Sequence, residues 1–230
     1  MAPGPKPRTE KTAAILTGDV VGSTEKPVGA LERAMEALAE AARGVSAWTG
    51  ADTRFTRYRG DGWQMQVAIP ALGLRAALFA FARLRAADAG LATRAAIGIG
   101  QVDSIGSGDL ADAHGSAFET SGHALDRMPR TRRLTIDGEG VTALHRIIVD
   151  LLDERTARWS REQAEAMALH LAPDNPTLTD IAPLLKISPQ AVNYRLAGAG
   201  GTVIRHALRD WEADFAATAT ATATVPGSAA

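Results

Sequence analysis

The sequence predicts an α+β fold in which a split βαβ, ferredoxin-like sheet with helices is followed by a small all-helical domain. Short apolar runs alternate with amphipathic stretches in the first part of the chain. One hairpin breaks this alternation, which favours a split βαβ arrangement over a doubly wound sheet. Beyond Val141 the strand signals stop and only helical patterns remain, so the composition shift marks a domain border near Gly138–Val141.

The first strand and the first helix have clear local signals. Ala13-Ala14-Ile15-Leu16 is a short apolar run that ends in Gly18-Asp19, which is typical of a buried strand over Thr12–Asp19. From Pro27 to Trp48, apolar residues recur at helical spacing, so this stretch predicts an amphipathic helix.

Two further strands, Phe55–Tyr58 and Trp63–Ile69, are joined by Arg59-Gly60-Asp61-Gly62, in which glycines flank an aspartate and indicate a hairpin turn. The expected strand Ala95–Val102 contains Ile97-Gly98-Ile99-Gly100, and glycines inside a strand indicate that a helix packs closely against it. The other expected elements are helices Leu72–Ala87 and Ser116–Met128, strand Leu134–Ile136, and helices His145–Arg155, Ser160–His170, Leu178–Leu185 and Pro189–Ala197.

The composition excludes several classes of protein. The 230 residues include no Cys, which excludes disulfide scaffolds, thiolate zinc sites and iron–sulfur clusters. Neither a signal-peptide pattern nor a long apolar run is present, so we expect a cytoplasmic protein with no membrane partner. The net charge of −1 means that nucleic-acid binding needs a local basic patch. We expect a disordered arm at 1–11, a sheet domain at 12–140, a helical domain at 141–215 and a disordered tail at 216–230.

Two aspartates form the candidate metal site: Asp19 at the end of the first strand and Asp61 at the tip of the hairpin. In a split βαβ sheet these carboxylates approach each other, and a cation between them relieves their repulsion. Mg²⁺ (or Mn²⁺) is expected, because it takes oxygen ligands and shares its shell with phosphates. The Val20 carbonyl could add a ligand, and Gly22-Ser23-Thr24 would present N–H groups to phosphate at a helix start. The alternative is that both aspartates only shape turns.

The segment Leu178–Leu196 resembles a helix-turn-helix. Ser188 is a suitable N-cap and Pro189 a suitable first residue for its second helix, in which Val192 faces inward. The alternative is a helical packing or dimerisation module, since acidic residues in the surrounding helices offset the local basic charge. On the DNA-binding interpretation, the side chains expected to contact bases or phosphates are Gln190, Asn193, Tyr194 and Arg195, with a local excess of positive charge from Lys186, Arg195, Arg205 and Arg209.

Two segments carry a resemblance to known families. Leu16–Thr24 together with Tyr58–Gly62 resembles the class III nucleotidyl cyclase domain, a palm-type fold in which two such segments supply the metal aspartates. The chain is still more similar to the SatD-like family of small bacterial proteins, over roughly residues 12 to 210, including the helix-turn-helix end. The resemblance implies that Asp19 and Asp61 are metal ligands of a cyclase-like palm domain.

The same resemblance assigns roles to other residues, with departures. Asp112 matches the Asp that helps to read the purine, and Arg57 stands where cyclases have a purine-reading Lys. Glu119 replaces the transition-state Asn, and His123 replaces the transition-state Arg. Nucleotidyl transfer depends mainly on stabilising developing charge, so these replacements should weaken standard cyclase chemistry.

Two functions follow as expectations. The first is a cytoplasmic DNA-binding regulator whose palm domain binds a Mg²⁺–nucleoside triphosphate. The second is a metal-dependent nucleotidyltransferase or atypical nucleotidyl cyclase that uses the two aspartates, with Glu119 and His123 as candidate catalytic residues. In either case a homodimer is expected, because cyclase sites and half-site readers usually pair subunits.

Overall fold

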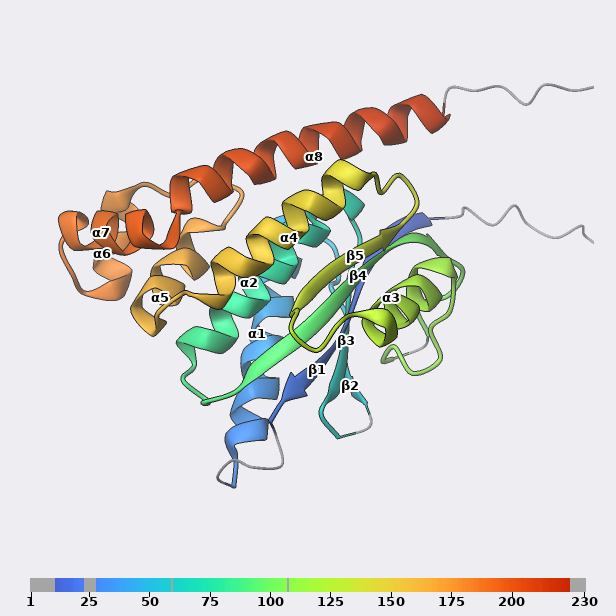
Figure 1. The fold of residues 1–230 in the computed structure, drawn as a ribbon, viewed down its shortest axis with the longest axis horizontal. Coiled ribbons are helices and arrows are strands. Elements are labelled where there is room, and N and C mark those ends of the chain that lie inside the picture. Colours follow the sequence, from blue (N-terminus) through green and yellow to red (C-terminus); the bar gives the residue numbers. More distant parts are fainter. Residues whose placement is uncertain (1–10, 23–27, 59, 107, 224–230) are drawn as a thin grey trace, which may run out of the picture.

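The computed structural model describes residues 11–22, 28–58, 60–106 and 108–223. Over these residues the chain forms an α+β structure with one mixed five-stranded sheet and eight α-helices (Figure 1). No helix within these ranges is long and apolar enough to cross a membrane.

The central strand of the sheet is β1, and the strand order is β2-β3-β1-β4-β5. β1 pairs antiparallel with both β3 and β4, β2 pairs antiparallel with β3, and β5 runs parallel to β4. The hairpin therefore lies directly beside the first strand, as expected for a split βαβ arrangement. The strands span Lys11–Val21 (β1), Phe55–Tyr58 (β2), Gly62–Val67 (β3), Ala92–Val102 (β4) and Leu134–Gly138 (β5).

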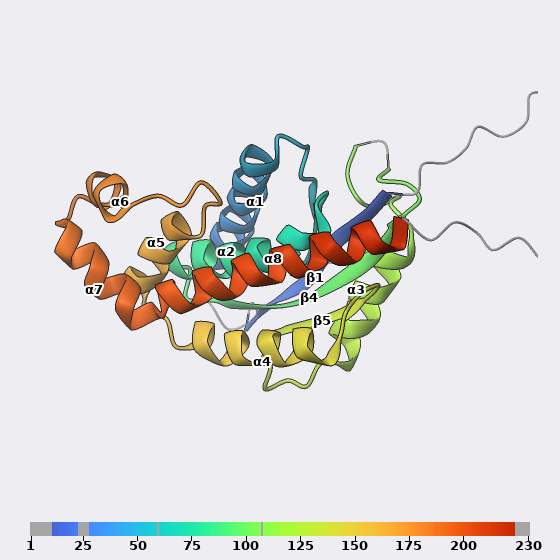
Figure 2. The ribbon, with the colours of Figure 1, turned by 90° about the horizontal axis from the view of Figure 1, so that it is seen from above.

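Helices cover both faces of the sheet (Figures 1 and 2). Alternate residues of β4 face opposite helices, as the pleat of a strand requires. Ile97 and Ile99 lie next to Gly73 at the start of α2, whereas Gly98 lies against Ser121 of α3. One face carries α1 (Ala30–Thr49) and α2 (Gly73–Ala86), which follows the 3₁₀ turn η2 (Pro70–Leu72), and the other face carries α3 (Ser116–Arg127).

Close contact between α3 and β4 explains the glycines of β4. A Cβ at Gly98 would lie 2.3 Å from the carbonyl oxygen of Ala117 and 2.5 Å from the backbone nitrogen of Ser121. A Cβ at Gly100 would lie 2.5 Å from Oγ of Ser116. The interpretation of these glycines as a site of close helix packing is therefore confirmed.

The remaining helices follow β5. Three of them begin with a capping box, in which Thr142, Ser160 or Thr177 accepts a hydrogen bond from the third helical residue. Viewed from above, the long helix α8 passes over α2 and runs alongside α4 (Figure 2). The bounds are Ala143–Ala157 (α4), Arg161–His170 (α5), Leu178–Leu185 (α6), Pro189–Ala199 (α7) and Gly201–Ala223 (α8).

A partly buried ion pair joins the sheet region to these helices. Arg75 on α2 is 4% exposed and donates hydrogen bonds to both carboxylate oxygens of Glu212 on α8, at 2.6 and 2.9 Å. It also donates to the carbonyl of Leu171, at 2.9 Å. One hydrophobic cluster includes buried residues from both sides of the expected border at residues 138–141, so the packing is continuous across it.

The C-terminal segment differs from the sequence prediction, because α8 is absent from the expected elements and continues to Ala223. The disordered tail expected at 216–230 is therefore helical as far as Ala223, and residues 224–230 lie outside the described residues. Trp211 and Phe215 are buried against His145 of α4 and anchor the helix. An anchored helix extends readily into an alanine-rich segment, because alanine has the highest helix propensity.

We predict that Gly98→Ala destabilises the protein by about 1–3 kcal/mol, because the added methyl group must push α3 away from the sheet. The matched control is Gly122→Ala on α3, where a Cβ would meet nothing within 4 Å. Removing a glycine from a helix interior should make that variant more stable by about 0.5–1 kcal/mol. Urea denaturation of both variants checks the prediction, and equal stabilities would contradict it.

Candidate functional site

The two predicted metal ligands meet at the C-terminal end of β1. Asp19 pairs with Gly62 of β3 on one side and with Arg94 of β4 on the other. Asp61 immediately precedes β3, and its carbonyl accepts a hydrogen bond of 3.0 Å from the backbone N–H of Val20. The sheet thus brings together two aspartates that are distant in the sequence.

The surroundings of Asp19 disfavour its negative charge. Burial raises the pKa of its carboxyl group, the positive charge of Arg94 lowers it, and the negative charge of Asp61 raises it again, with a net increase. The side chain is 36% exposed, so a ligand can still reach it from solvent. A carboxylate in this position is stabilised by an additional cation.

Arg94 is a site residue that sequence reasoning missed. Its Nη1 lies 3.7 Å from the carboxylate of Asp19, and its Nη2 donates to the carbonyls of Met128 (2.8 Å) and Leu125 (3.4 Å) beyond and within the last turn of α3. Its Nε is buried and has no hydrogen-bond partner among the described residues. Arg94 therefore places a positive charge beside Asp19. Only the register between β1 and β4 reveals this contact.

Buried side chains hold the backbone at Asp19 in place. Thr93 Oγ1 donates to the Asp19 carbonyl at 2.6 Å and accepts a hydrogen bond of 2.8 Å from the indole N–H of Trp63. A Cβ at Gly18 would lie 2.5 Å from the Trp63 ring and 2.4 Å from the carbonyl of Arg94. A glycine is therefore required before Asp19 so that the indole can pack against the strand.

The donors available at this end of β1 are two carboxylates. In the part of the chain that the structure describes, no group of three or more His, Asp or Glu side chains could enclose a metal. Asp19 and Asp61 offer two carboxylates, and Mg²⁺ is commonly held by one or two carboxylates together with water and phosphate oxygens. The backbone N–H of Val20 donates to the carbonyl of Asp61, so the residue that follows Asp19 is also in contact with Asp61.

Of the predicted phosphate-binding turn, Gly22 lies within the described residues. Gly22 follows β1 with a φ of +76°, in the left-handed region that glycine adopts without strain. Ser23 and Thr24 lie outside the described residues.

Arg57, the predicted base-reading residue, is engaged within the protein. Its Nη1 donates to both carboxylate oxygens of Glu32 in the first turn of α1, at 3.0 and 2.8 Å. Its Nε donates to the carbonyl of Gly60, at 2.6 Å. Arg57 therefore braces the hairpin against α1, and a bound base would have to compete with Glu32 for its guanidinium group.

The remaining predicted nucleotide and catalytic residues have exposed side chains. Asp112 lies in the loop that precedes α3, and Glu119 and His123 lie on α3. The helix contacts the centre of β1 through Ser121, whose Oγ is 2.7 Å from Oγ1 of Thr17. The end of α3 is linked to Asp19 through Arg94.

The predicted DNA-contacting helix is α7. This helix follows a short turn after α6. Ser188 caps its first turn, because the Ser188 side chain accepts a 3.2 Å hydrogen bond from the backbone N–H of Ala191. Val192 of the same helix is buried. Asn193 and Tyr194 are exposed, the latter at 78%, and Gln190 is exposed as well.

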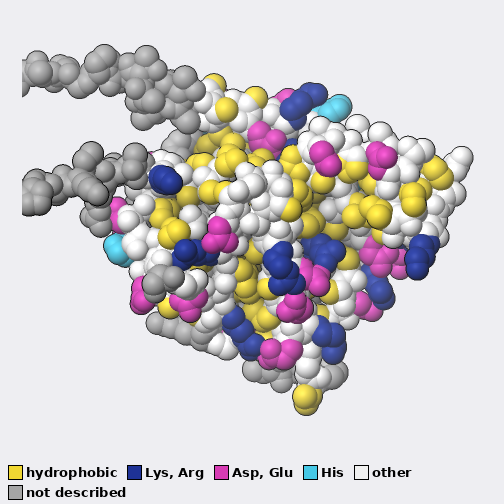
Figure 3. Space-filling view, turned by 180° about the vertical axis from the view of Figure 1, so that it is seen from behind, with side chains coloured by type: hydrophobic (Ala, Val, Ile, Leu, Met, Phe, Trp, Pro, Cys, Tyr) yellow, Lys and Arg dark blue, Asp and Glu magenta, His cyan; other side chains and the backbone are white. Residues whose placement is uncertain are grey.

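Arg195 differs from these three residues. It is 24% exposed and forms a 3.0 Å ion pair with Glu165 of α5. Arg205 donates to His170 at 2.6 Å, and Arg209 is paired with Asp210. Seen from behind, basic and acidic side chains are interspersed over the surface (Figure 3). Neighbouring groups therefore engage most of the positive charge that the sequence predicted for this region.

Comparison with models of known protein families and with curated proteins gives no match to this sequence. The candidate site therefore depends on its own geometry: two carboxylates and one arginine at the end of β1, together with an exposed polar face on α7.

The raised pKa of Asp19 has a consequence for stability. The folded protein binds a proton at Asp19 more tightly than the unfolded chain, so ionisation of this group reduces stability as pH rises past the ordinary value of 3.8. We predict that Asp19→Asn is more stable than the wild type at pH 7, and that this gain disappears below about pH 3.

Urea denaturation at both pH values measures this effect. Asp126→Asn, at an exposed position on α3, is the control and should change little at either pH. A loss of stability in Asp19→Asn at pH 7 would show that the ion pair with Arg94 outweighs the cost of burial.

Proposed function

We propose that this protein is a cytoplasmic DNA-binding regulator whose N-terminal part is a cyclase-like palm domain that binds a Mg²⁺–nucleotide. One observation carries the proposal: Asp19 and Asp61 meet at the end of β1, where burial and the second carboxylate disfavour the charge of Asp19. A divalent cation is the ligand that relieves this unfavourable arrangement.

The connectivity of the sheet supports a palm domain. The first four strands are joined as βαββαβ and lie in the order β2-β3-β1-β4, with every pairing among them antiparallel. This strand order and these strand directions support a ferredoxin-like split βαβ fold. The two aspartates lie at the end of its central strand and in the adjacent hairpin, as the resemblance to nucleotidyl cyclases implies.

In this proposal Asp19 and Asp61 hold Mg²⁺ (or Mn²⁺), with the Val20 carbonyl as a third protein ligand. The ion would neutralise the carboxylates and attract the phosphates of a nucleoside triphosphate. Arg94 lies beside Asp19. Once the cation takes over the neutralisation of Asp19, the guanidinium group of Arg94 can pair with a phosphate oxygen.

The other predicted contacts complete the nucleotide site. The Gly22-Ser23-Thr24 turn would receive the phosphates at the start of α1. Arg57 and Asp112 would recognise the base, which requires Arg57 to exchange its contact with Glu32 for the ligand.

In the helical part, α6 and α7 would act as a helix-turn-helix. Gln190, Asn193 and Tyr194 form the exposed face that would enter the major groove. Arg195 joins α7 to Glu165 of α5 and is better suited to holding this face in position than to contacting DNA directly. A two-fold DNA site would require a homodimer.

A nucleotide controls DNA binding only if it favours one arrangement of the helices over another. The partly buried ion pair between Arg75 of α2 and Glu212 of α8 connects the sheet region with the C-terminal helices. A shift of α2 caused by nucleotide binding would therefore be transmitted to α8, which directly follows α7.

An enzymatic role is the second candidate, as a metal-dependent nucleotidyltransferase or atypical cyclase. Its specific support is Arg94, which provides a guanidinium group beside the metal aspartates where His123 lacks one. Such a group stabilises negative charge that develops during phosphoryl transfer. Incubation with Mg²⁺ and each nucleoside triphosphate, followed by chromatography of the products, tests this role.

We predict that fluorescent ATP or GTP analogues bind in the presence of Mg²⁺, and that Asp61→Asn weakens binding at least tenfold because one metal ligand is lost. Fluorescence anisotropy titrations with and without EDTA provide the measurement. Asp126→Asn is the matched control, since it removes the same charge from an exposed site. Binding that is insensitive to both EDTA and Asp61→Asn would refute the metal–nucleotide site.

For DNA binding, we predict that Lys186→Gln lowers the affinity for a duplex and reduces the slope of log affinity against log salt by about one. Asn193→Ala should weaken binding only to a preferred sequence. Arg43→Gln on α1 removes the same charge from an exposed position and should have no effect. Gel-shift titrations at several salt concentrations measure these effects, and an unchanged slope in Lys186→Gln would contradict the proposed interface.

A further inference from the structure

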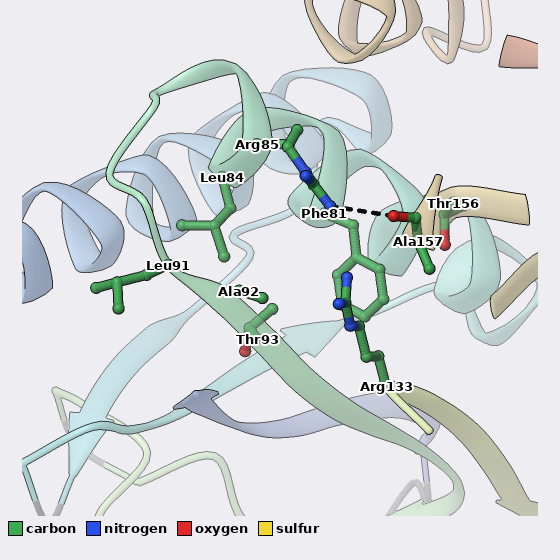
Figure 4. Close-up of a pocket in the computed structure, with 9 residues that line it drawn as sticks. All are labelled: Phe81, Leu84, Arg85, Leu91, Ala92, Thr93, Arg133, Thr156 and Ala157. Atoms are coloured by element: carbon green, nitrogen blue, oxygen red, sulfur yellow. Dashed lines mark hydrogen bonds between the residues drawn. The ribbon is translucent and has the colours of Figure 1, made fainter. Parts of the chain in front are cut away.

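A second charged cluster lies on the α2 side of the sheet. It consists of two arginines that line a small cavity: Arg85 in the last turn of α2 and Arg133 just before β5. Thr93 of β4 lines the same cavity. Thr156 and Ala157 at the end of α4 form another wall. The side chains of the two arginines extend into this space from different elements (Figure 4).

Neither guanidinium group forms an ion pair with a carboxylate among the described residues. Arg85 donates one hydrogen bond of 3.3 Å, to the carbonyl of Ala157. The guanidinium group of Arg133 makes no hydrogen bond to a described residue. The backbone of Arg133 is held at the sheet, because its carbonyl oxygen accepts a hydrogen bond from the N–H of Ala95. Since each guanidinium has five N–H donors, most of the donors around the cavity remain available.

The acidic side chains of the neighbouring helix α4 are already engaged. Its buried aspartate accepts a backbone N–H of the loop before β5, and two exposed acids of the same helix pair with other arginines. Among the described residues, no carboxylate of α4 forms an ion pair with either arginine side chain. The contacts are Asp153 with the backbone nitrogen of Arg133 (3.0 Å), Asp150 with Arg132, and Glu154 with Arg158.

The two positive charges act on each other. Burial and then the charge of Arg133 lower the pKa of Arg85, so an anion between the two groups would favour the charged form of Arg85. The planar guanidinium groups match the geometry of a phosphate or carboxylate and bind it through paired, charge-assisted hydrogen bonds.

We propose that this cavity binds a small oxyanion of the phosphate type between Arg85 and Arg133. Its volume of about 30 Å³ is small, which favours a small anion over a base or a sugar. The flexible stems of the arginines allow the two head groups to part around a tetrahedral anion at the cavity mouth. The cavity lies on the α2 side of β4, whereas Arg94 and its cross-strand partner Asp19 lie on the α3 side, so the cavity is separate from the proposed metal site.

The test is a titration of thermal stability with inorganic phosphate, in EDTA and at ionic strength held constant with sodium chloride. The melting temperature of the wild type should rise along a saturable curve. Arg85→Gln and Arg133→Gln should each weaken the response at least tenfold. Arg158→Gln removes a charge from an exposed residue of the same region and should keep the full response.

A charge reversal gives a second, independent measurement. Arg133→Glu would place a carboxylate opposite Arg85, so the variant should melt at a higher temperature than the wild type without phosphate and should no longer respond to phosphate. This outcome cannot be produced by a variant that merely folds poorly.

Two results would overturn the proposal. An equal phosphate response in Arg85→Gln, Arg133→Gln and Arg158→Gln would indicate diffuse attraction to the protein surface. Loss of the response in Asp19→Asn/Asp61→Asn would assign the anion to the other site. Phenyl phosphate distinguishes the sources of the anion: binding as strong as that of inorganic phosphate identifies a phosphate ester head group, and weaker binding identifies the inorganic ion.

Discussion

The register of β1 between β3 and β4 is the constraint on which the candidate site depends. Because Asp19 pairs with Gly62 on one side and Arg94 on the other, it is fixed next to Asp61 and next to a positive charge at the same time. A shift of one residue in either pairing would turn the Asp19 side chain to the opposite face of the sheet. The close packing at Gly18 makes such a shift costly, since a side chain in that position would collide with Trp63.

Local patterns predicted most of the elements but not this register. The strand Phe55–Tyr58 and the helix Leu178–Leu185 are found at the expected residues, because their apolar spacing and turn residues are encoded within a few positions. The approach of Arg94 to Asp19 depends instead on how two strands align that are far apart in the sequence. No local signal marks Arg94, and it could have been found only by placing β4 against β1 residue by residue.

The contacts of polar side chains were harder to predict than the positions of helices and strands. Arg57 and Arg195 were expected to contact ligands, yet they pair with Glu32 and Glu165. A sequence shows that a side chain is charged, but the packing of α1 and α5 decides which carboxylate faces it. The pair of Arg57 with Glu32 is partly exposed and contributes only about 0–1 kcal/mol, so a nucleotide can replace it at little cost. Arg57 thus stays within reach of a nucleotide, whereas the less exposed Arg195 holds α7 against α5.

The two charged clusters lie on opposite faces of one strand. Consecutive residues of β4 point to opposite sides of the sheet. Arg94 therefore lies beside Asp19 on one side, and Thr93 lines the arginine cavity on the other. Thr93 also donates a 2.6 Å hydrogen bond to the carbonyl of Asp19. A divalent cation on one face and an oxyanion on the other would attract each other through the protein interior, where charges are poorly screened. Because coupling between two binding sites is reciprocal, each ligand would then strengthen the binding of the other by the same factor.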